Sequence, residues 1–155
     1  MCTMFKADAF TGYRVLITGS SRGIGLNVAM ALRQCGADIA VHGTEAPSSA
    51  CYGDGKGTVV SLAGDFREEG VATTVVDAAI AQLGGLDCLI NNAGTMLGRN
   101  PIAEMTPQLY KQVQHLNAFS LVEASVAAIP ALRRSVRASI INTTSISART
   151  GGSPG

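Results

Sequence analysis

The sequence has little net charge and no long apolar run. Lys and Arg number 12 against 11 Asp and Glu, which leaves a net charge of +1 at neutral pH. No basic cluster is longer than the pair Arg133–Arg134, so there is no electrostatic basis for binding nucleic acid or an anionic membrane. Because no apolar stretch reaches about 18 residues, we expect no membrane span. The first ten residues, MCTMFKADAF, lack the continuous apolar region of a secretory signal.

The sequence also lacks the cysteine and histidine spacings of metal and redox sites. No two of the cysteines form a Cys-x-x-Cys pair, and together with His42 and His115 they do not match a zinc motif. We therefore expect reduced thiols, mostly buried, in a cytoplasmic protein. The cysteines are Cys2, Cys35, Cys51 and Cys88.

Short β-branched runs alternate regularly with helical patterns along the chain. With 46% apolar and 15% charged residues the composition argues against disorder, and a chain of 155 residues suits one domain over residues 1–155. The sequence predicts buried strands at 14–18, 38–42, 58–62, 88–91 and 138–144, and helices at 24–35, 67–83 and 106–132. Strands with two apolar faces that alternate with helices predict an α/β fold with a parallel, doubly wound sheet.

A glycine-rich turn, TGSSRGIG at residues 18–25, joins the first predicted strand to the first predicted helix. Gly19 would allow a tight turn with positive φ, Gly23 a close approach to a pyrophosphate, and Gly25 close packing of the helix on the sheet. The amide groups of the helix N-terminus would attract phosphate. The spacing differs from the common G-x-G-x-x-G, so the turn alone does not decide between a cofactor site and an ordinary turn. GDGKGT, at 53–58, lacks the ending of a phosphate loop and is interpreted as a flexible turn.

Four further motifs follow the glycine turn in order. GDF at 64–66 carries Asp65, NNAG spans 91–94, HLNAFS contains Asn117, and INTTSIS contains Ser145. Together with TGSSRGIG, these motifs resemble the short-chain dehydrogenase/reductase family over nearly the whole chain. The resemblance implies a Rossmann-type, three-layer α/β/α fold, incomplete here at about five strands. It also implies hydride transfer between a nicotinamide and a carbonyl or secondary alcohol, as in a 3-oxoacyl reductase.

The resemblance implies roles for individual residues. Ser145 would position the substrate carbonyl and Asn117 would hold a water in a proton relay, so these two are the candidate catalytic residues. The candidate cofactor-binding residues are Thr18, Gly19, Ser21, Arg22, Gly23, Ile24, Gly25, Thr44, Asp65, Phe66, Asn91, Ala93, Gly94 and Thr143. Taken singly, each match could equally be structural: a strand-end cap, a turn, a helix-interior amide or a loop hydroxyl.

The end of the second predicted strand favours NADP(H) over NAD(H). NAD-binding folds carry an acidic residue there, about 20 residues after the glycine turn, for the ribose 2′-hydroxyl. Gly43 occupies that position, Thr44 follows it, and Arg22 in the turn could meet a 2′-phosphate. Glu45, one or two places later, is the observation against this prediction.

The family resemblance also implies a Tyr-x-x-x-Lys pair on a helix after the last predicted strand. The lysine would lower the tyrosine pKa, whose unperturbed value of about 10 is too high for efficient proton transfer at neutral pH. Tyr52 and Lys56 match this spacing, but they lie in the glycine-containing YGDGK, and we interpret the match as accidental. The required helix would begin just beyond Gly155. The chain alone is therefore expected to be inactive, with an exposed edge on its last strand and uncovered apolar helix faces.

Three functions stay open from the sequence: the N-terminal part of an NADP(H)-dependent oxidoreductase, a non-catalytic NADP(H)-binding module, and a non-functional gene fragment. The expected partner is a small carbonyl or alcohol substrate. Full-length family members are expected to be homo-oligomers. This expectation does not extend to the 155-residue chain. The sequence does not identify the substrate. Met96, Leu97 and Ile146 would either line the near wall of the site or pack in the core.

Overall fold

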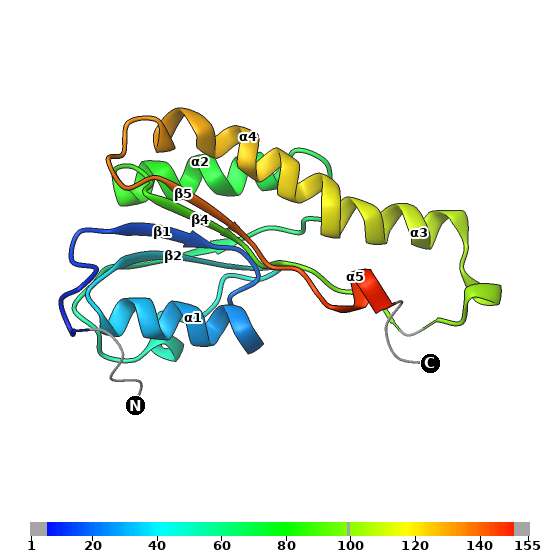
Figure 1. Cartoon of the computed structure of the whole chain (residues 1–155), viewed down its shortest axis with the longest axis horizontal. Coiled ribbons are helices and arrows are strands. Elements are labelled where there is room, and N and C mark those ends of the chain that lie inside the picture. The colour runs from blue at the N-terminus through cyan, green and yellow to red at the C-terminus, as the bar shows by residue number, and fades with distance from the viewer. Residues whose placement is uncertain (1–5, 99, 151–155) are drawn as a thin grey trace.

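The chain forms a parallel five-stranded sheet with helices on both faces (Figure 1). The computed structural model describes residues 6–98 and 100–150, so Cys2 and the tail at 151–155 lie outside the described residues. The strands are β1 (Arg14–Ile17), β2 (Asp38–Gly43), β3 (Val59–Ala63), β4 (Cys88–Asn91) and β5 (Ser139–Asn142). The α-helices are α1 (Gly23–Gln34), α2 (Val71–Leu83), α3 (Pro107–Gln114), α4 (Ser120–Leu132) and α5 (Ser147–Thr150). Short 3-10 helices span Ser49–Tyr52 and Ile102–Glu104.

The strand order β3-β2-β1-β4-β5 places β1 at the centre of the sheet. After β1 the chain runs outward through β2 and β3 and then crosses back to β4 on the other side of β1, with every pairing parallel. This confirms the predicted doubly wound α/β fold of about five strands. The order reverses between β1 and β4, and in open α/β sheets ligands bind outside the carboxyl ends of the strands at such a point.

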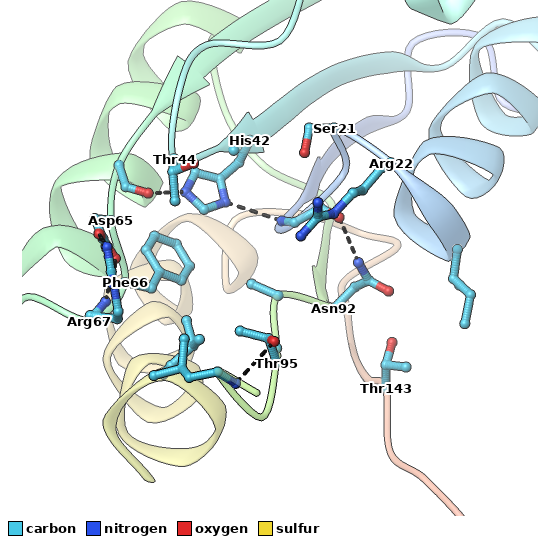
Figure 2. A pocket seen from close by; sticks show the side chains of 18 residues that line it. Ser21, Arg22, His42, Thr44, Asp65, Phe66, Arg67, Asn92, Thr95 and Thr143 are labelled. Atoms are coloured by element: carbon cyan, nitrogen blue, oxygen red, sulfur yellow. Dashed lines mark hydrogen bonds and ion pairs between the residues drawn. The ribbon is translucent and has the colours of Figure 1, made fainter. Parts of the chain in front are cut away.

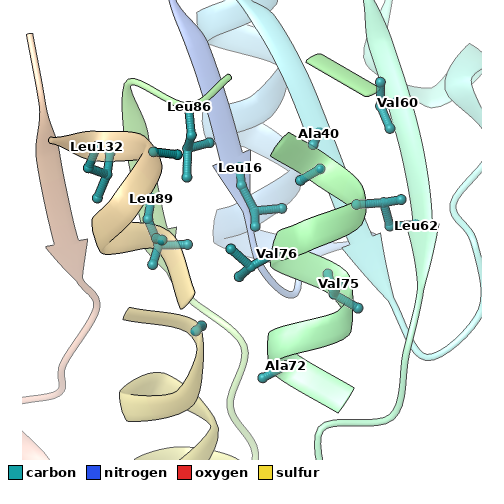
Figure 3. Close-up of a cluster of buried hydrophobic side chains, with 14 of the residues drawn as sticks. Leu16, Ala40, Val60, Leu62, Ala72, Val75, Val76, Leu86, Leu89 and Leu132 are labelled. Carbon is teal, nitrogen blue, oxygen red and sulfur yellow. The ribbon is translucent and has the colours of Figure 1, made fainter. Parts of the chain in front are cut away.

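Helices cover both faces of the sheet, and the strand residues therefore alternate between two cores. On β1, Val15 and Ile17 pack with the α1 side, whereas Leu16 packs with α2 and α4, and all three side chains are fully buried. Figure 3 shows Leu16 and Leu89 of the sheet facing Val76 of α2. The alternation follows from the two-residue period of a β-strand.

Local signals set the ends of the helices. Thr106 caps α3, because its Oγ1 accepts a hydrogen bond from the backbone N–H of Leu109 at 3.1 Å, and Pro107 occupies the first turn as predicted. α2 begins at Val71 rather than at residue 67. Gly70 immediately before it adopts a left-handed conformation with φ of 80°, which a continuous helix cannot cross.

The predicted helix at 106–132 is divided by a π-helical segment, His115–Phe119, between α3 and α4. Such segments are rare and occur frequently at functional sites. Pro130 lies inside α4, which continues to Leu132. By length and composition alone, Pro107–Leu132 could cross a membrane, so the expectation that no stretch is long and apolar enough is wrong. This is weak evidence of a span, because the core helix of a soluble protein passes the same test.

The sheet ends at β5, whose side chains are much more exposed than those of β1. Ile140 and Ile141 are 38% and 51% exposed. On the adjacent α4, Val122 and Val126 are also exposed. The expected exposed strand edge and uncovered apolar helix face are therefore both present.

Cysteines do not form a site in the described part of the chain. Cys88 is buried, Cys35 is half-buried and Cys51 is exposed, and all three are free thiols. The expectation of mostly buried thiols is therefore wrong for Cys51. No group of three or more His, Cys, Asp or Glu residues that could hold a metal ion occurs among the described residues.

Candidate functional site

A cavity of about 510 Å³ lies at the carboxyl ends of the central strands, where the strand order reverses. Figure 2 shows Asp65 and Phe66 on one side of it, Thr143 on the other, and Arg22 and Asn92 between them. Ten predicted cofactor-binding residues line it: Gly19, Ser21, Arg22, Ile24, Thr44, Asp65, Phe66, Ala93, Gly94 and Thr143. Leu97, expected either to line the near wall of the site or to pack in the core, also lines it. Seven further lining residues were not among the candidates: His42, Gly43, Gly64, Arg67, Asn92, Thr95 and Leu116.

Thr18 lies behind the cavity wall rather than in it, and it joins the two loops that form this wall. The side chain is buried, and its Oγ1 accepts hydrogen bonds from the backbone N–H groups of Asn92 and Ala93, each at 3.0 Å. In return, Asn92 Nδ2 donates to the carbonyls of Thr18 and Gly19 at 3.0 and 2.9 Å. These bonds fix the glycine turn after β1 against the NNAG loop after β4.

The glycines of the turn have different tasks. Gly19 has a φ of 62°, which confirms the predicted tight turn. Gly25 is buried, and a Cβ there would lie 2.5 Å from the Gly19 carbonyl oxygen and 2.6 Å from Asn92 Nδ2. Gly25 therefore permits close packing of α1 under the turn and does not line the cavity. A Cβ on Gly23, in contrast, would enter open space, although its φ of 60° strains any other residue.

Asn91, one of the cofactor-binding candidates, does not line the cavity. Its Nδ2 donates to Asn142 Oδ1 on β5 at 2.9 Å and to Ser125 Oγ on α4 at 3.1 Å. Asn92, the next residue along the chain, does line the cavity. Asn91 instead ties β4 to β5 and α4.

His42 is a buried side chain of the cavity that sequence reasoning missed, and both of its ring nitrogens have hydrogen-bond partners. It is 3% exposed, its Nδ1 accepts from the Gly19 N–H at 3.1 Å, and its Nε2 lies 2.9 Å from the Gly64 carbonyl oxygen. The ring stacks on Phe66 with centroids 4.1 Å apart. Burial lowers the pKa of His42 below its ordinary value, partly offset by the Gly64 hydrogen bond and by the Asp65 charge.

Tyr52 supports the same turn from beneath. It is fully buried, and its hydroxyl donates to the Ser20 carbonyl at 2.9 Å. Burial raises its pKa above the ordinary value for a phenol. This supports the interpretation of the Tyr52–Lys56 spacing as accidental. It also shows that the stretch after β2, interpreted as a loop, holds a short helix that anchors the turn.

Asp65 and Arg67 form an ion pair on the cavity side nearest β3. Arg67 Nε lies 2.9 Å from each carboxylate oxygen of Asp65, and Arg67 Nη2 also contacts Oδ2. The hydrogen bonds from Arg67 hold the pKa of Asp65 below its ordinary value. Asp65 is therefore a carboxylate that can accept a hydrogen bond from a ligand.

The start of α1 presents polar groups to the cavity. Arg22 is the N-cap residue, and within the described part of the chain its side chain makes no capping hydrogen bond. The first backbone N–H groups of α1 are thus left for a ligand, as expected at a helix N-terminus that binds an anion. Ser21 adjoins Gly43, where a Cβ would lie 3.3 Å from Ser21 Oγ. No acidic side chain lines this part of the cavity among the described residues.

Asn117 lies in the π-helical segment and joins it to the loop after β4. Its Nδ2 donates to the Thr95 carbonyl at 2.8 Å and to the Val113 carbonyl at 2.7 Å. A Cβ on Gly94 would come within 2.7 Å of Asn117 Oδ1. Asn117 itself does not line the cavity, although its neighbour Leu116 does.

Ser145 follows β5 and is exposed outside the cavity lining. Its Oγ accepts a hydrogen bond from the backbone N–H of Ser147 at 3.1 Å, at the start of α5. The four-residue helix α5 that begins there has neither Tyr nor Lys, so it is not the expected helix with the Tyr-x-x-x-Lys pair. Met96 and Ile146 are 66% and 68% exposed, so core packing is wrong for both of them.

With this geometry in view, residues 13–154 match the sequence pattern of the short chain dehydrogenases. The chain belongs to that family. An L-fucose dehydrogenase from Bos taurus is 34% identical over 144 residues, which cover 92% of this chain and 53% of that protein. The chain spans between 49 and 56% of the length of the curated relatives that it matches.

Solved short chain dehydrogenase structures share the fold. The NADH-dependent reductase A1-R′ complexed with NAD is 30% identical and superposes with a TM-score of 0.87. The match covers 96% of this chain and 66% of the reductase chain. A short chain dehydrogenase from Burkholderia cenocepacia J2315 in complex with NADP is 27% identical, with a TM-score of 0.81 over 94% of this chain and 60% of its own. Nicotinamide cofactors are thus bound within the family, and the uncapped start of α1 suits their phosphate groups.

Proposed function

We propose that this chain forms the cofactor-binding part of an NADP(H)-dependent oxidoreductase that acts on a carbonyl or secondary alcohol, in the manner of a 3-oxoacyl reductase. One observation carries the proposal: the cavity at the strand reversal combines an uncapped helix start with Arg22 and a glycine at the end of β2. When bound, the nicotinamide supplies or accepts the hydride. The substrate partner is a small molecule.

The preference for NADP(H) rests on Gly43 and Arg22. An NAD-binding fold places a carboxylate at the end of β2 for the ribose 2′-hydroxyl, and Gly43 has no side chain to do so. Arg22, Ser21 and Thr44 line the adjacent wall and can donate hydrogen bonds to a 2′-phosphate. Glu45, the counter-evidence from sequence, does not line the cavity.

The other lining residues divide between the two ends of the cofactor. Asp65 and Phe66 would hold the adenine, the start of α1 the pyrophosphate, and Gly94 and Thr143 the nicotinamide end. Thr18, Gly25 and Asn91 act by holding the surrounding turns and strands in place, as their hydrogen bonds and close contacts indicate.

We further propose that Ser145 positions the substrate oxygen and Asn117 supports a water in the proton relay. The printed sequence contains no Tyr-x-x-x-Lys after β5 to transfer the proton. Removing a general acid costs about 10²–10⁴-fold in rate, and losing the cofactor-positioning lysine with it costs more. Residues 1–155 alone are therefore expected to show no turnover. A measurable NADPH oxidation rate with any ketone contradicts this expectation.

Calorimetric titration of the whole chain with NADPH and NADH tests the cofactor proposal. We expect tighter binding of NADPH, and we expect Arg22→Gln to weaken NADPH binding by about tenfold or more while leaving NADH binding unchanged, since a charged hydrogen bond is worth about 1.5–3 kcal/mol. Arg133→Gln is the matched control, because Arg133 is exposed at the end of α4 and does not line the cavity. Tighter NADH binding overturns the preference.

A non-catalytic NADP(H)-binding module is the second candidate, because the glycine turn is fully supported whereas Ser145 and Asn117 lie outside the cavity lining. The coding sequence downstream of codon 155 distinguishes the two. A Tyr-x-x-x-Lys pair there favours the oxidoreductase, and its absence together with tight NADPH binding favours the module. We propose a cytoplasmic location for either, consistent with the free thiols.

A further inference from the structure

We propose that His42 is a proton-sensitive positioning residue for the cofactor site: the neutral ring fastens the glycine turn to the end of β3, and protonation releases the turn and weakens NADP(H) binding. This inference rests on the proposed function and adds a regulated step to it. His42 acts through Gly19 and not by direct chemistry on the substrate. The residue lies on β2, at the wall shared by the glycine turn and the loop after β3.

The two ring nitrogens of His42 have opposite hydrogen-bonding roles. Nδ1 faces the backbone N–H of Gly19 at 3.1 Å and can only accept, so it carries no proton. Nε2 faces the carbonyl oxygen of Gly64 at 2.9 Å and must donate, so it carries the proton. This pair of partners specifies one neutral tautomer. The ring thereby bridges β1 and β3 across β2.

Protonation of Nδ1 is incompatible with this arrangement. A second N–H on the ring would point at the N–H of Gly19, leaving two donors opposed without an acceptor between them at a part-buried site. The ring has little freedom to turn away, because it is stacked on Phe66 and is 3% exposed. The Gly64 hydrogen bond would persist. Gly19 is therefore the group that must move when the ring gains a proton.

Movement of Gly19 changes both walls of the cavity. A Cβ on Gly19 would lie only 2.7 Å from the Cα of Ala93, so the turn already packs tightly on the loop after β4. Asn92 Nδ2 is bonded to the Gly19 carbonyl at 2.9 Å and would shift with it. The start of α1, which would hold the pyrophosphate, follows four residues later at Gly23. Protonation of His42 would therefore displace the phosphate-binding groups at the start of α1, which are linked to the ring through two or three contacts.

The surroundings of His42 keep the ring neutral near pH 7. Burial lowers its pKa, while the Gly64 carbonyl and the Asp65 carboxylate after β3 act in the opposite direction. Asp65 is itself paired with Arg67, and Arg22 of the glycine turn lines the same cavity. The ring thus has both positive and negative charges nearby. Because Nδ1 must accept the Gly19 hydrogen bond, only the neutral form of the His42 ring is compatible with this arrangement. The stabilising contribution of the neutral ring is full above the unfolded-state pKa of about 6.5 and declines as pH falls towards the lower folded value.

Calorimetric Kd values for NADP⁺, measured on the whole chain from pH 8 to pH 5, test the inference. His42→Asn is the matched variant, because Asn Oδ1 can accept from the Gly19 N–H at the place of Nδ1 but does not titrate. If only the neutral ring permits binding, the wild-type Kd rises about tenfold once 10% of the protein holds a neutral ring. The 2′-phosphate also titrates near pH 6, but it does so equally with both proteins. We therefore expect the ratio of wild-type to His42→Asn Kd to rise towards acid pH, and to reach about tenfold one pH unit below the pKa of His42.

The outcomes separate this inference from the proposed function. Absence of NADP⁺ binding to the wild type at pH 8 overturns the proposed function and the inference with it. Binding at pH 8 with the same pH profile in both proteins overturns the inference alone. NAD⁺, which lacks the 2′-phosphate, should show the same ratio, because the turn holds the pyrophosphate common to both cofactors.

An NMR titration of the wild type keeps the test decisive if His42→Asn does not fold. The chain has two histidines, and His115 lies in the π-helical segment and does not line the cavity. We expect the Gly19 amide signal to move with the same midpoint as the His42 ring signals, below the ordinary histidine value. A Gly19 signal that stays fixed while the ring titrates overturns the inference.

Discussion

Strands β1 and β5 have similar apolar sequences and opposite environments. β1 carries Val15, Leu16 and Ile17, all with no exposed surface, whereas Ile140 and Ile141 on β5 are 38% and 51% exposed. β1 pairs with β2 and β4 and lies under helices on both faces, while among the described strands β5 pairs with β4 alone. The neighbours of a strand, rather than its own side chains, therefore determine how deeply it is buried.

The two sides of the cavity differ in the same way. On the side of the glycine turn, Thr18, Ser20 and His42 have hydrogen-bond partners that hold the backbone in one conformation. On the side of β5, Ser145 is exposed and bonds only locally, to the start of a four-residue helix. The cofactor side is thus preorganised, whereas the candidate catalytic serine depends on a less supported segment. The five predictions below test this contrast.

The largest effect should come from truncating the centre of β1. Leu16→Ala deletes a side chain that is fully buried between the sheet and α2, and such changes cost about 2–5 kcal/mol of unfolding free energy. Ile141→Ala on β5 is the matched control and should cost about 0.5 kcal/mol or less. Urea unfolding followed by circular dichroism measures both. Equal losses would refute the contrast between the strands.

The second-largest loss of stability should come from removing the charge of Asp87, because this carboxylate joins β1 to the segment before β5. Asp87 accepts from the Arg14 backbone and side chain, each at 2.9 Å, and from Ser135 Oγ at 2.6 Å. Asp87→Asn should cost about 1.5–3 kcal/mol at pH 7. Asp77→Asn, at an exposed site on α2, is the control and should change little.

The Asp87 carboxylate should also make the unfolding free energy depend on pH. The Arg14 hydrogen bond holds the pKa of Asp87 well below its ordinary value, so the unfolded chain binds the proton more readily. Its stabilising effect is therefore present above the unfolded-state pKa of about 3.9 and is lost as pH falls below it. The difference between wild type and Asp87→Asn should narrow from pH 7 to pH 3 in urea unfolding. A constant difference would exclude this role.

Gly25→Ala should act on the cofactor side with a somewhat smaller cost in stability. The new Cβ would lie 2.5 Å from the Gly19 carbonyl oxygen, and overpacking of this kind costs about 1–3 kcal/mol. NADPH binding should weaken as well, because α1 and the turn must separate. Gln34→Ala, at an exposed site at the far end of α1, is the control. Calorimetry that finds unchanged NADPH affinity for Gly25→Ala would contradict this packing argument.

The smallest effect on stability should come from Ile141→Lys. The residue is half exposed on an edge strand, so the unfolding free energy should change by about 0.5 kcal/mol or less. Charged side chains on an edge oppose strand-to-strand association, and the variant should therefore sediment as smaller species at high concentration. Identical sedimentation of variant and wild type would show that the β5 edge does not cause association.

Local sequence signals predicted most of the elements that carry the site. Thr106 with Pro107 fixed the start of α3, and Gly19 was assigned a positive φ, both as found. The order of motifs predicted which loops meet at the cavity. The NNAG motif did not distinguish Asn91, which bonds to β5 and α4, from Asn92, which lines the cavity.

Other site features had no local signal. His42 is a single histidine in an apolar strand, and nothing nearby in sequence indicates that its ring contacts Gly19 and Gly64. Its partners come from two other strands, and parallel pairing alone brings them together. The π-helical segment around Asn117 was also not predicted, because the helical periodicity continues on both sides of it.

The sequence by itself determined the alternation of strands and helices, the glycine turn and the family, because these depend on residue spacing and on motifs contiguous in the chain. The tertiary structure decided which of the neighbouring polar residues face the cavity, and it decided that β1 is buried while β5 is exposed. The physical reason is that burial and hydrogen bonding belong to pairs of elements. A strand acquires them only from the neighbours that its topology supplies.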